Sequence, residues 1–211
     1  MSVGVLFDKV DMRYVGLAVT SVVLVAAGFA GYRWHRANKE QKAQEAFSSC
    51  MREYQRAERD PNLWPNAELV FKLAIEQNPS SSFTPSLLAY QAETLVQMGK
   101  PEQALECMNK AVELLSTSSE LYHLYATKQA LMMMDAADDS TKEKGLAVLT
   151  TLANNSTNNV RDMAQYYLGL YSWVHDDIAT ARAVWSELLP LAEADPASPW
   201  AERAAQKLNL V

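Results

Sequence analysis

The hydrophobic pattern of the chain changes once, at Arg33. Between Arg13 and Arg33 lie nineteen consecutive residues, 14–32, without a charged side chain. Beyond Arg33, apolar positions recur three or four residues apart, the spacing of one face of a helix. Asn-Pro, Gly-Lys-Pro, Asp-Asp and Asn-Asn sequences divide this region into segments, because such residues stop helices and start new ones. The pattern predicts an all-α chain, in which a series of shorter amphipathic helices follows one long apolar helix.

The apolar stretch 14–32 predicts a transmembrane helix. At 1.5 Å per residue it reaches about 28 Å, which crosses the hydrocarbon core of a bilayer. Tyr14, Tyr32 and Trp34 lie at its two ends, where aromatic side chains prefer the headgroup level. The alternative is a cleavable signal peptide with small residues at 28–30, but the stretch is longer than the roughly 7–15 residues typical of such a leader. We therefore expect the span to be retained as an anchor.

The basic residues that flank the span bear on its orientation. Two precede it and four follow it, namely Lys9, Arg13, Arg33, Arg36, Lys39 and Lys42. Basic residues concentrate on the cytoplasmic side of a membrane, so this count favours a cytoplasmic C-terminal domain. A difference of two residues is a modest bias, and by itself it leaves the topology open.

The clearest repeating unit, residues 87–115, resembles a tetratricopeptide repeat over both of its helices. Ala92 matches the small position of the first helix, Gly99 the turn, and Ala104 and Ala111 the two small positions of the second helix. Two antiparallel helices approach closely only where side chains are short, and the turn between them favours a residue tolerant of positive φ. The resemblance implies a stack of helix pairs.

Three further units follow this pattern less closely. They cover residues 48–81, 120–153 and 162–190. The middle one fits only if about seven extra residues around 135–144 lengthen its turn. In the last one, Asp176 takes the place of the turn glycine. A final helix, 199–208, is expected to cover the end of the stack, because an exposed terminal repeat reduces solubility.

These patterns predict a transmembrane helix followed by a tetratricopeptide-like helical solenoid of about four helix pairs and a C-terminal capping helix. The predicted parts are an N-terminal flank (1–13), the transmembrane helix (14–32), a juxtamembrane helical linker (33–47) and a tetratricopeptide-like domain (48–211).

Together with this layout, three segments extend the resemblance to nearly the whole chain. They are YRWHRANKEQKAQEA after the span, GLYSWVHDDIATARAVWSELL in the last unit, and the terminal AAQKLNLV. The chain resembles the YfgM-like family of ancillary SecYEG translocon subunits. The resemblance implies an inner-membrane protein with a cytoplasmic N-terminus and a periplasmic solenoid. It also implies partners, the Sec translocon and periplasmic chaperones or client polypeptides, and a role in the biogenesis of secreted or membrane proteins.

The implied topology disagrees with the count of basic residues, and we give the whole-chain layout more weight. The alternative is a membrane-tethered scaffold whose tetratricopeptide domain lies in the cytoplasm and recruits a soluble protein complex. The sequence leaves open which client or partner binds and in which oligomeric state the chain works.

Composition narrows the classes of function. Hydrophobic residues make up 49% of the 211, enough for a sizeable core, and 7 glycines and 8 prolines are too few for the many tight turns of an all-β fold. A formal net charge of −6 argues against nucleic-acid binding. Cys50 and Cys107 are expected on helices that are not neighbours, as two free thiols.

Chemistry-bearing motifs are missing from the sequence. No G-x-S-x-G, Walker-type glycine loop, H-E-x-x-H or C-x-x-C occurs, and His35, His123 and His175 lie in three separate segments. We therefore predict a protein without catalytic residues, cofactor or metal, whose function is to bind other proteins.

The repeat register predicts which side chains bind a partner. Tetratricopeptide stacks bind through the inner faces of the first helix of each pair. These positions are Met163, Tyr166, Leu170, Trp173 and Val174 in the last unit, and His123, Thr127 and Leu131 in the unit before it. Methionine, aromatic and apolar side chains suit hydrophobic stretches of a non-native chain. The alternative is that these residues pack against the closing helix.

Overall fold

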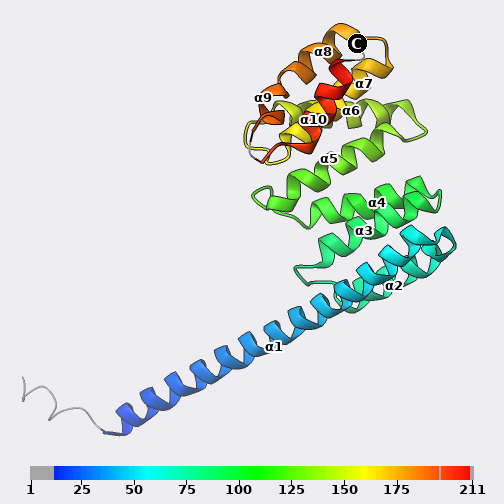
Figure 1. Cartoon of the computed structure of the whole chain (residues 1–211). Helices are drawn as coiled ribbons and strands as arrows, with labels where there is room; N and C mark the ends of the chain where they lie inside the picture. Colours follow the sequence, from blue (N-terminus) through cyan, green and yellow to red (C-terminus); the bar gives the residue numbers. More distant parts are fainter. Residues whose placement is uncertain (1–11, 195, 210–211) are drawn as a thin grey trace, which may run out of the picture.

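The computed structural model describes residues 12–194 and 196–209, the side chains of residues 12–23 and 25 excepted, and the described chain is built of helices (Figure 1). No β-strand occurs in these ranges, which confirms the all-α prediction. The elements are α1 (Met12–Arg59), the 3₁₀ helix η2 (Pro61–Leu63), α2 (Trp64–Gln77), α3 (Thr84–Gln97), α4 (Pro101–Glu113), α5 (Glu120–Met134), α6 (Asp139–Asn154), α7 (Arg161–Val174), α8 (Ile178–Ser186), α9 (Leu189–Ala192) and α10 (Pro199–Leu208).

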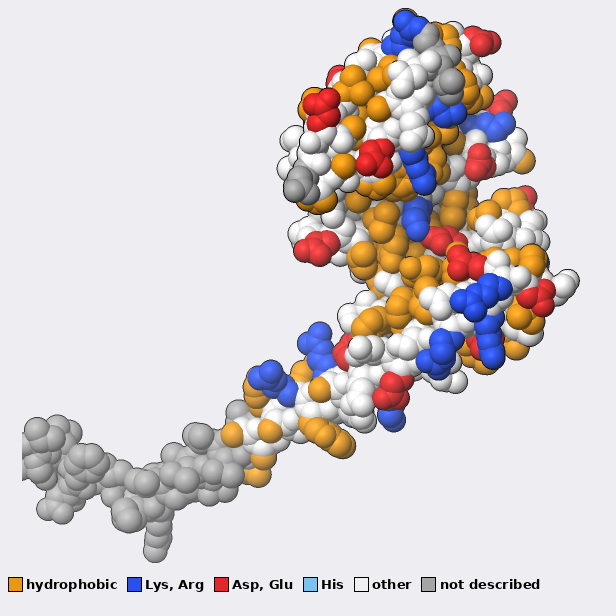
Figure 2. All heavy atoms as spheres, viewed as in Figure 1, with side chains coloured by type: hydrophobic (Ala, Val, Ile, Leu, Met, Phe, Trp, Pro, Cys, Tyr) orange, Lys and Arg blue, Asp and Glu red, His pale blue; other side chains and the backbone are white. Residues whose placement is uncertain are grey.

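The helices are arranged like those of a helical-repeat protein. Consecutive helices pack in pairs, the C-terminal part of α1 with α2, α3 with α4, α5 with α6 and α7 with α8, and each pair stacks on the next (Figure 1). The predicted closing helix has the expected bounds: α10 spans Pro199–Leu208 and packs on α7, α8 and α9. The surface of the stack is hollowed on one side, and hydrophobic side chains line much of this hollow (Figure 2).

Short side chains lie where the paired helices touch. Ala92 on α3 and both Ala104 and Ala111 on α4 are fully buried, as predicted for these small residues. The turn residues behave as predicted too, because Gly99 has a φ of 70° and Asp176, in the place of the turn glycine, has a φ of 61°. Aspartate is one of the few residues with a side chain that tolerates this left-handed conformation.

Gly169 marks the closest approach within the last pair. A Cβ at this position would lie 2.7 Å from Cδ1 of the Trp185 indole on α8. Trp185 is fully buried, and its Nε1 donates a hydrogen bond to the backbone oxygen of Tyr166 at 3.0 Å. The glycine therefore makes room for the largest side chain of the core of this pair.

The extra residues around 135–144 lengthen a helix and not a turn, so that expectation was wrong. α5 ends at Met134 and α6 already begins at Asp139. The reason is an N-cap: the Asp138 carboxylate accepts a hydrogen bond from the backbone N–H of Thr141 at 2.8 Å. The N-terminal turns of α6 therefore project beside the end of α5.

The first helix, α1, is one continuous rod of 48 residues whose C-terminal part belongs to the stack (Figure 1). Its first buried side chain among those described is Ala43, whereas Leu24, Phe29 and Trp34 are 62–71% exposed. Among the side chains that the structure describes, no helix is both long and apolar enough to cross a membrane. Residues 1–11 of the predicted flank and most side chains of the predicted span 14–32 lie outside that set.

A carboxylate fastens the rod to the loop between α2 and α3. Glu40 accepts hydrogen bonds from the hydroxyls of Ser81 and Ser82, at 2.7 and 2.8 Å, and from the backbone N–H of Ser82 at 3.1 Å. These bonds, the one from Ser81 above all, lower the pKa of the Glu40 carboxyl below its usual value. The ionised form is thus the one that ties the rod to the loop between α2 and α3.

Replacing Gly169 by alanine is expected to destabilise the fold by about 1–3 kcal/mol, because the new methyl group overpacks against the Trp185 indole. Glycine-to-alanine changes inside helices otherwise stabilise by about 1 kcal/mol. Thermal unfolding of the full chain in detergent, followed by circular dichroism, measures the effect. Combining G169A with W185F should recover part of the loss, whereas strictly additive losses would contradict the assigned contact.

Replacing Glu40 by glutamine is expected to lower stability by about 1 kcal/mol at neutral pH, because charge-assisted hydrogen bonds are lost. A carboxyl whose pKa is lowered by folding stabilises the fold above its unfolded pKa, and this contribution is lost as the pH falls through the folded pKa. The difference between wild type and E40Q in unfolding temperature should therefore shrink below about pH 4. The matched control is E45Q, a change of the exposed Glu45 on the same helix; an equal difference at all pH values would contradict the role of Glu40.

Candidate functional site

The predicted groove residues of α7 fall into different environments. Met163 and Tyr166 are buried, at 5% and 8% exposure, and Trp173 is half-buried. Leu170 is half-buried as well, whereas Val174, at the end of the helix, is 65% exposed. Only the C-terminal half of this face is therefore open to a partner.

The buried part of the α7 face holds the last helices of the chain. The Tyr166 ring centroid lies 5.5 Å from that of Trp200 on α10 and 6.4 Å from that of Trp185 on α8. The Trp173 ring lies 6.4 Å from Trp185, and the Lys207 ammonium sits 4.2 Å from its centroid. For Tyr166 and Trp173 the geometry matches the alternative interpretation, packing against the closing helix.

The predicted residues of α5 divide in the same way. Thr127 is fully buried, and its hydroxyl donates to the backbone oxygen of His123 at 2.8 Å. The half-buried His123 ring packs edge-on against Tyr122, at 5.5 Å between centroids. One turn further along, Leu131 reaches an open cavity.

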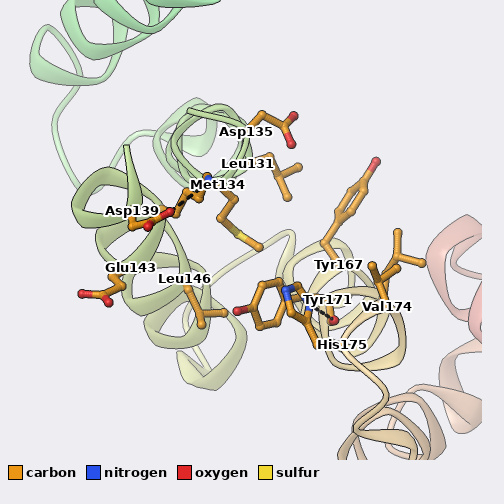
Figure 3. Close-up of a pocket in the computed structure, with 12 residues that line it drawn as sticks. Leu131, Met134, Asp135, Asp139, Glu143, Leu146, Tyr167, Tyr171, Val174 and His175 are labelled. Carbon is orange, nitrogen blue, oxygen red and sulfur yellow. Dashed lines mark hydrogen bonds and ion pairs between the residues drawn. The ribbon is translucent and has the colours of Figure 1, made fainter. Parts of the chain in front are cut away.

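This cavity, of about 850 Å³, lies between α5, α6 and α7 (Figure 3). It brings together three of the eight predicted groove residues, Leu131, Leu170 and Val174. The remaining apolar and aromatic lining consists of Met134, Leu146, Tyr167 and Tyr171. A largely apolar hollow of this size is typical of binding sites for a few side chains or a small ligand.

The α6 side of the cavity was missed by the sequence reasoning. Asp139, Lys142, Glu143 and Leu146 come from the N-terminal turns of α6. The pattern assigned most of these residues to a lengthened turn, so no helix face was expected there. The available signal was the N-cap sequence starting at Asp138, which predicts a helix start at that position.

Acidic groups dominate the charged rim. Asp135, Asp139 and Glu143 contribute three carboxylates against the single ammonium of Lys142, which pairs with Asp139 at 3.1 Å. Among the residues with described side chains, no ion pair engages Asp135 or Glu143. The rim therefore carries a net negative charge near two.

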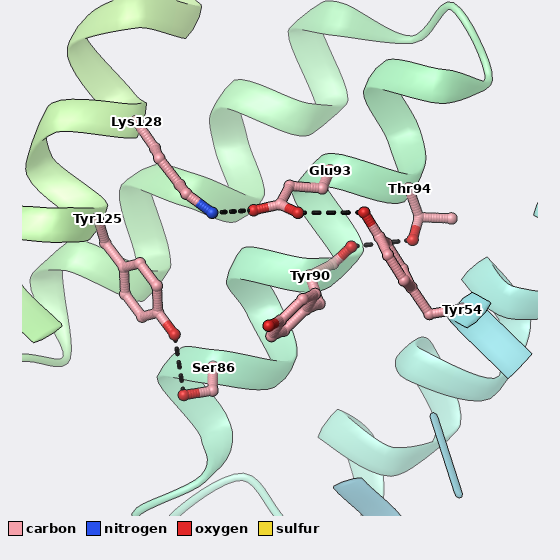
Figure 4. A network of polar contacts seen from close by, with 7 residues as sticks. All are labelled: Tyr54, Ser86, Tyr90, Glu93, Thr94, Tyr125 and Lys128. Atoms are coloured by element: carbon pink, nitrogen blue, oxygen red, sulfur yellow. Dashed lines mark hydrogen bonds and ion pairs between the residues drawn. The ribbon is translucent and has the colours of Figure 1, made fainter. Parts of the chain in front are cut away.

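Polar side chains join the first helices of the earlier pairs (Figure 4). The Tyr54 hydroxyl on α1 donates to Glu93 on α3 at 3.2 Å, and Lys128 on α5 forms an ion pair with the same carboxylate. The Tyr125 hydroxyl also donates to Ser86 at 3.0 Å. Burial and the negative charge of Glu93 raise the pKa of the Tyr54 phenol, so it remains a donor across the physiological range.

Two kinds of reactive side chain, metal ligands and thiols, can be placed in the parts of the chain that the structure describes. No group of three or more metal-ligating side chains lies together among those residues. Both cysteines are free thiols, and Cys50 is buried, with its sulfur 3.6 Å from the backbone oxygen of Val70. Burial raises the pKa of the Cys50 thiol to about 11, which keeps it protonated and a poor nucleophile.

No protein-family model matches the chain, and no curated protein matches it.

Two substitutions separate packing residues from cavity residues. Replacing the buried Tyr166 by alanine should cost about 3–5 kcal/mol, because it leaves a hole between α7, α8 and α10. Replacing the exposed Val174 by serine should change stability by less than about 0.5 kcal/mol. Chemical denaturation of the full chain measures both, and a Y166A protein as stable as wild type would mean that Tyr166 does not hold the closing helix.

Proposed function

We propose that this chain is a membrane-anchored protein-interaction module built from tetratricopeptide-like repeats. The observation that carries the proposal is the cavity where Leu131, Leu170 and Val174 meet, at the open end of a face that the repeat register assigns to binding. Stacked helix pairs with buried alanines at the expected positions support the assignment to this repeat class. The domain acts by binding and not by catalysis.

The anchor is the N-terminal part of α1. Residues 14–32 carry no charge, and the exposed Leu24, Phe29 and Tyr32 have no packing partner in the stack. Large apolar side chains on a projecting rod are unfavourable in water and favourable in lipid. The exposed Trp34 and the adjacent Arg33 suit the headgroup level at its end.

The resemblance to the YfgM-like family supports a proposal for the cellular location of the chain. The N-terminus lies in the cytoplasm and the repeat domain in the periplasm, beside the Sec translocon. There the module binds periplasmic chaperones or client polypeptides and assists the biogenesis of secreted or membrane proteins.

A second candidate is a membrane-tethered scaffold with a cytoplasmic repeat domain that recruits a soluble complex. The observation in its favour is the basic flank after the span, with four basic residues there against two before the span. The two candidates differ in the side of the membrane on which α2–α10 lie, and one experiment separates them.

In bacterial cells that make the full chain, protease added to spheroplasts is expected to degrade the repeat domain, because the span leaves that domain outside the inner membrane. Antibody against a C-terminal epitope measures the loss, and a soluble cytoplasmic protein must stay intact. A repeat domain that stays protected in the membrane fraction would exclude the periplasmic topology and favour the cytoplasmic scaffold.

The control tests the anchor itself. The double variant L24R/A27R places two arginines near the centre of the span. Each arginine raises the free energy of membrane insertion by roughly 2.5–3.5 kcal/mol, so the chain should move to the soluble, protease-protected fraction. The matched variant Q103R/Q206R adds the same charge at two exposed positions of α4 and α10 and should behave as wild type. Membrane retention of L24R/A27R would contradict the anchor.

A further inference from the structure

We propose that the cavity between α5, α6 and α7 binds a segment of another polypeptide in which an apolar or aromatic anchor is flanked by lysine or arginine. The inference rests on the proposed function as an interaction module and names the chemistry of the partner. It is carried by the juxtaposition of an open apolar hollow, fixed aromatic walls and an acidic rim (Figure 3).

The floor of the cavity selects an apolar side chain. Leu131, Leu146 and Leu170 are half-buried, and Val174 stays 65% exposed at the mouth. A guest side chain that covers these groups removes apolar surface from water, which is the main driving force of such binding. A hollow of about 850 Å³ accommodates large anchors such as leucine or tryptophan.

The aromatic walls are held in place before a partner arrives. The Tyr171 ring lies 4.0 Å from the His175 ring, whose Nδ1 is 2.8 Å from the backbone oxygen of Tyr171. The Tyr167 ring packs 5.3 Å from Trp200 on α10. Side chains that their neighbours already hold in place lose little conformational entropy on binding, so the free energy cost of binding a segment is smaller.

The rim selects the charge of the flanking residues. Asp135 and Glu143 lie at the mouth together with the paired Asp139 and Lys142, which leaves an excess of about two negative charges. Cationic side chains beside the anchor meet this excess, and they also meet the tyrosine faces, which attract cations. The rim would repel an acidic segment, and so would the whole chain, whose formal net charge is −6.

The test uses the full chain in nanodiscs of phosphatidylcholine, a lipid without net charge, with empty nanodiscs as the blank. Two fluorescein-labelled synthetic peptides are compared by fluorescence anisotropy, Lys-Lys-Leu-Trp-Ala-Leu-Lys-Lys and the same peptide with glutamate in place of every lysine. The basic peptide should bind at least about tenfold more tightly than the acidic one, and added salt should weaken its binding.

Three variants locate the binding. D135N/E143Q should reduce the affinity for the basic peptide by about tenfold, because the acidic excess is removed. V174S should reduce it several-fold through lost apolar contact while leaving the fold intact. E76Q/E106Q, which removes two exposed carboxylates from α2 and α4, is the matched control for net charge and should bind as wild type.

Several results would overturn the inference. These are absence of binding to a folded wild-type chain, equal affinity for the two peptides, and binding unaffected by D135N/E143Q. If analytical ultracentrifugation shows a wild-type dimer that the V174S substitution dissociates, the cavity binds a second copy of the chain. If a neutral apolar dye binds in the cavity and the basic peptide does not displace it, the cavity binds a small apolar ligand. Proteolysis of spheroplasts tests anchoring and topology without any peptide. A failure of peptide binding can therefore be distinguished from a failure of the proposed membrane placement.

Discussion

The close approach of paired helices is the constraint on which the rest of the structure depends. Ala104 and Ala111 on α4 have no exposed surface, and Gly169 leaves room on α7 for the Trp185 indole. Helices separated by longer side chains would carry the indole away from the backbone oxygen of Tyr166 that its Nε1 now reaches. Because packed interiors tolerate little change of volume, these short residues set the spacing of the pairs. The positions of the polar links and of the cavity follow from that spacing.

Much of the fold could be predicted because its signals are local. A small residue, a turn residue and a helix start each occupy a short stretch of sequence, and Asp176 and Pro199 were assigned their structural places from such stretches. The start of α6 carries an equally local signal at Asp138, whereas the tetratricopeptide register places a lengthened turn there. A regular repeat therefore predicts the regular part of a stack and misplaces its irregular part.

The candidate site was predictable only in part, because burial on α7 depends on a helix far along the chain. The periodicity of α7 shows that Tyr166 and Leu170 share a face. The same periodicity does not show that Trp200 of α10 covers Tyr166. The cavity is also lined by residues from α6, most of which were expected in a turn and not on a helix face. The repeat register correctly placed Leu131, Leu170 and Val174 on inner helix faces, and these three residues line the cavity.

The two ends of the stack differ in the polar contacts that join their helices. Glu93 links Tyr54 on α1 to Lys128 on α5, so the first three layers are tied to the rod. Between α5 and α7, no side-chain hydrogen bond or ion pair joins the two helices in the described chain, and the cavity opens there. From Tyr32 to Ala43 the rod extends about 16 Å at 1.5 Å per residue. If residues 14–32 cross a bilayer, this length of rod separates the stack from the lipid surface, and the Glu40 bonds hold the loop between α2 and α3 against the rod, so the acidic mouth of the cavity keeps its orientation relative to α1.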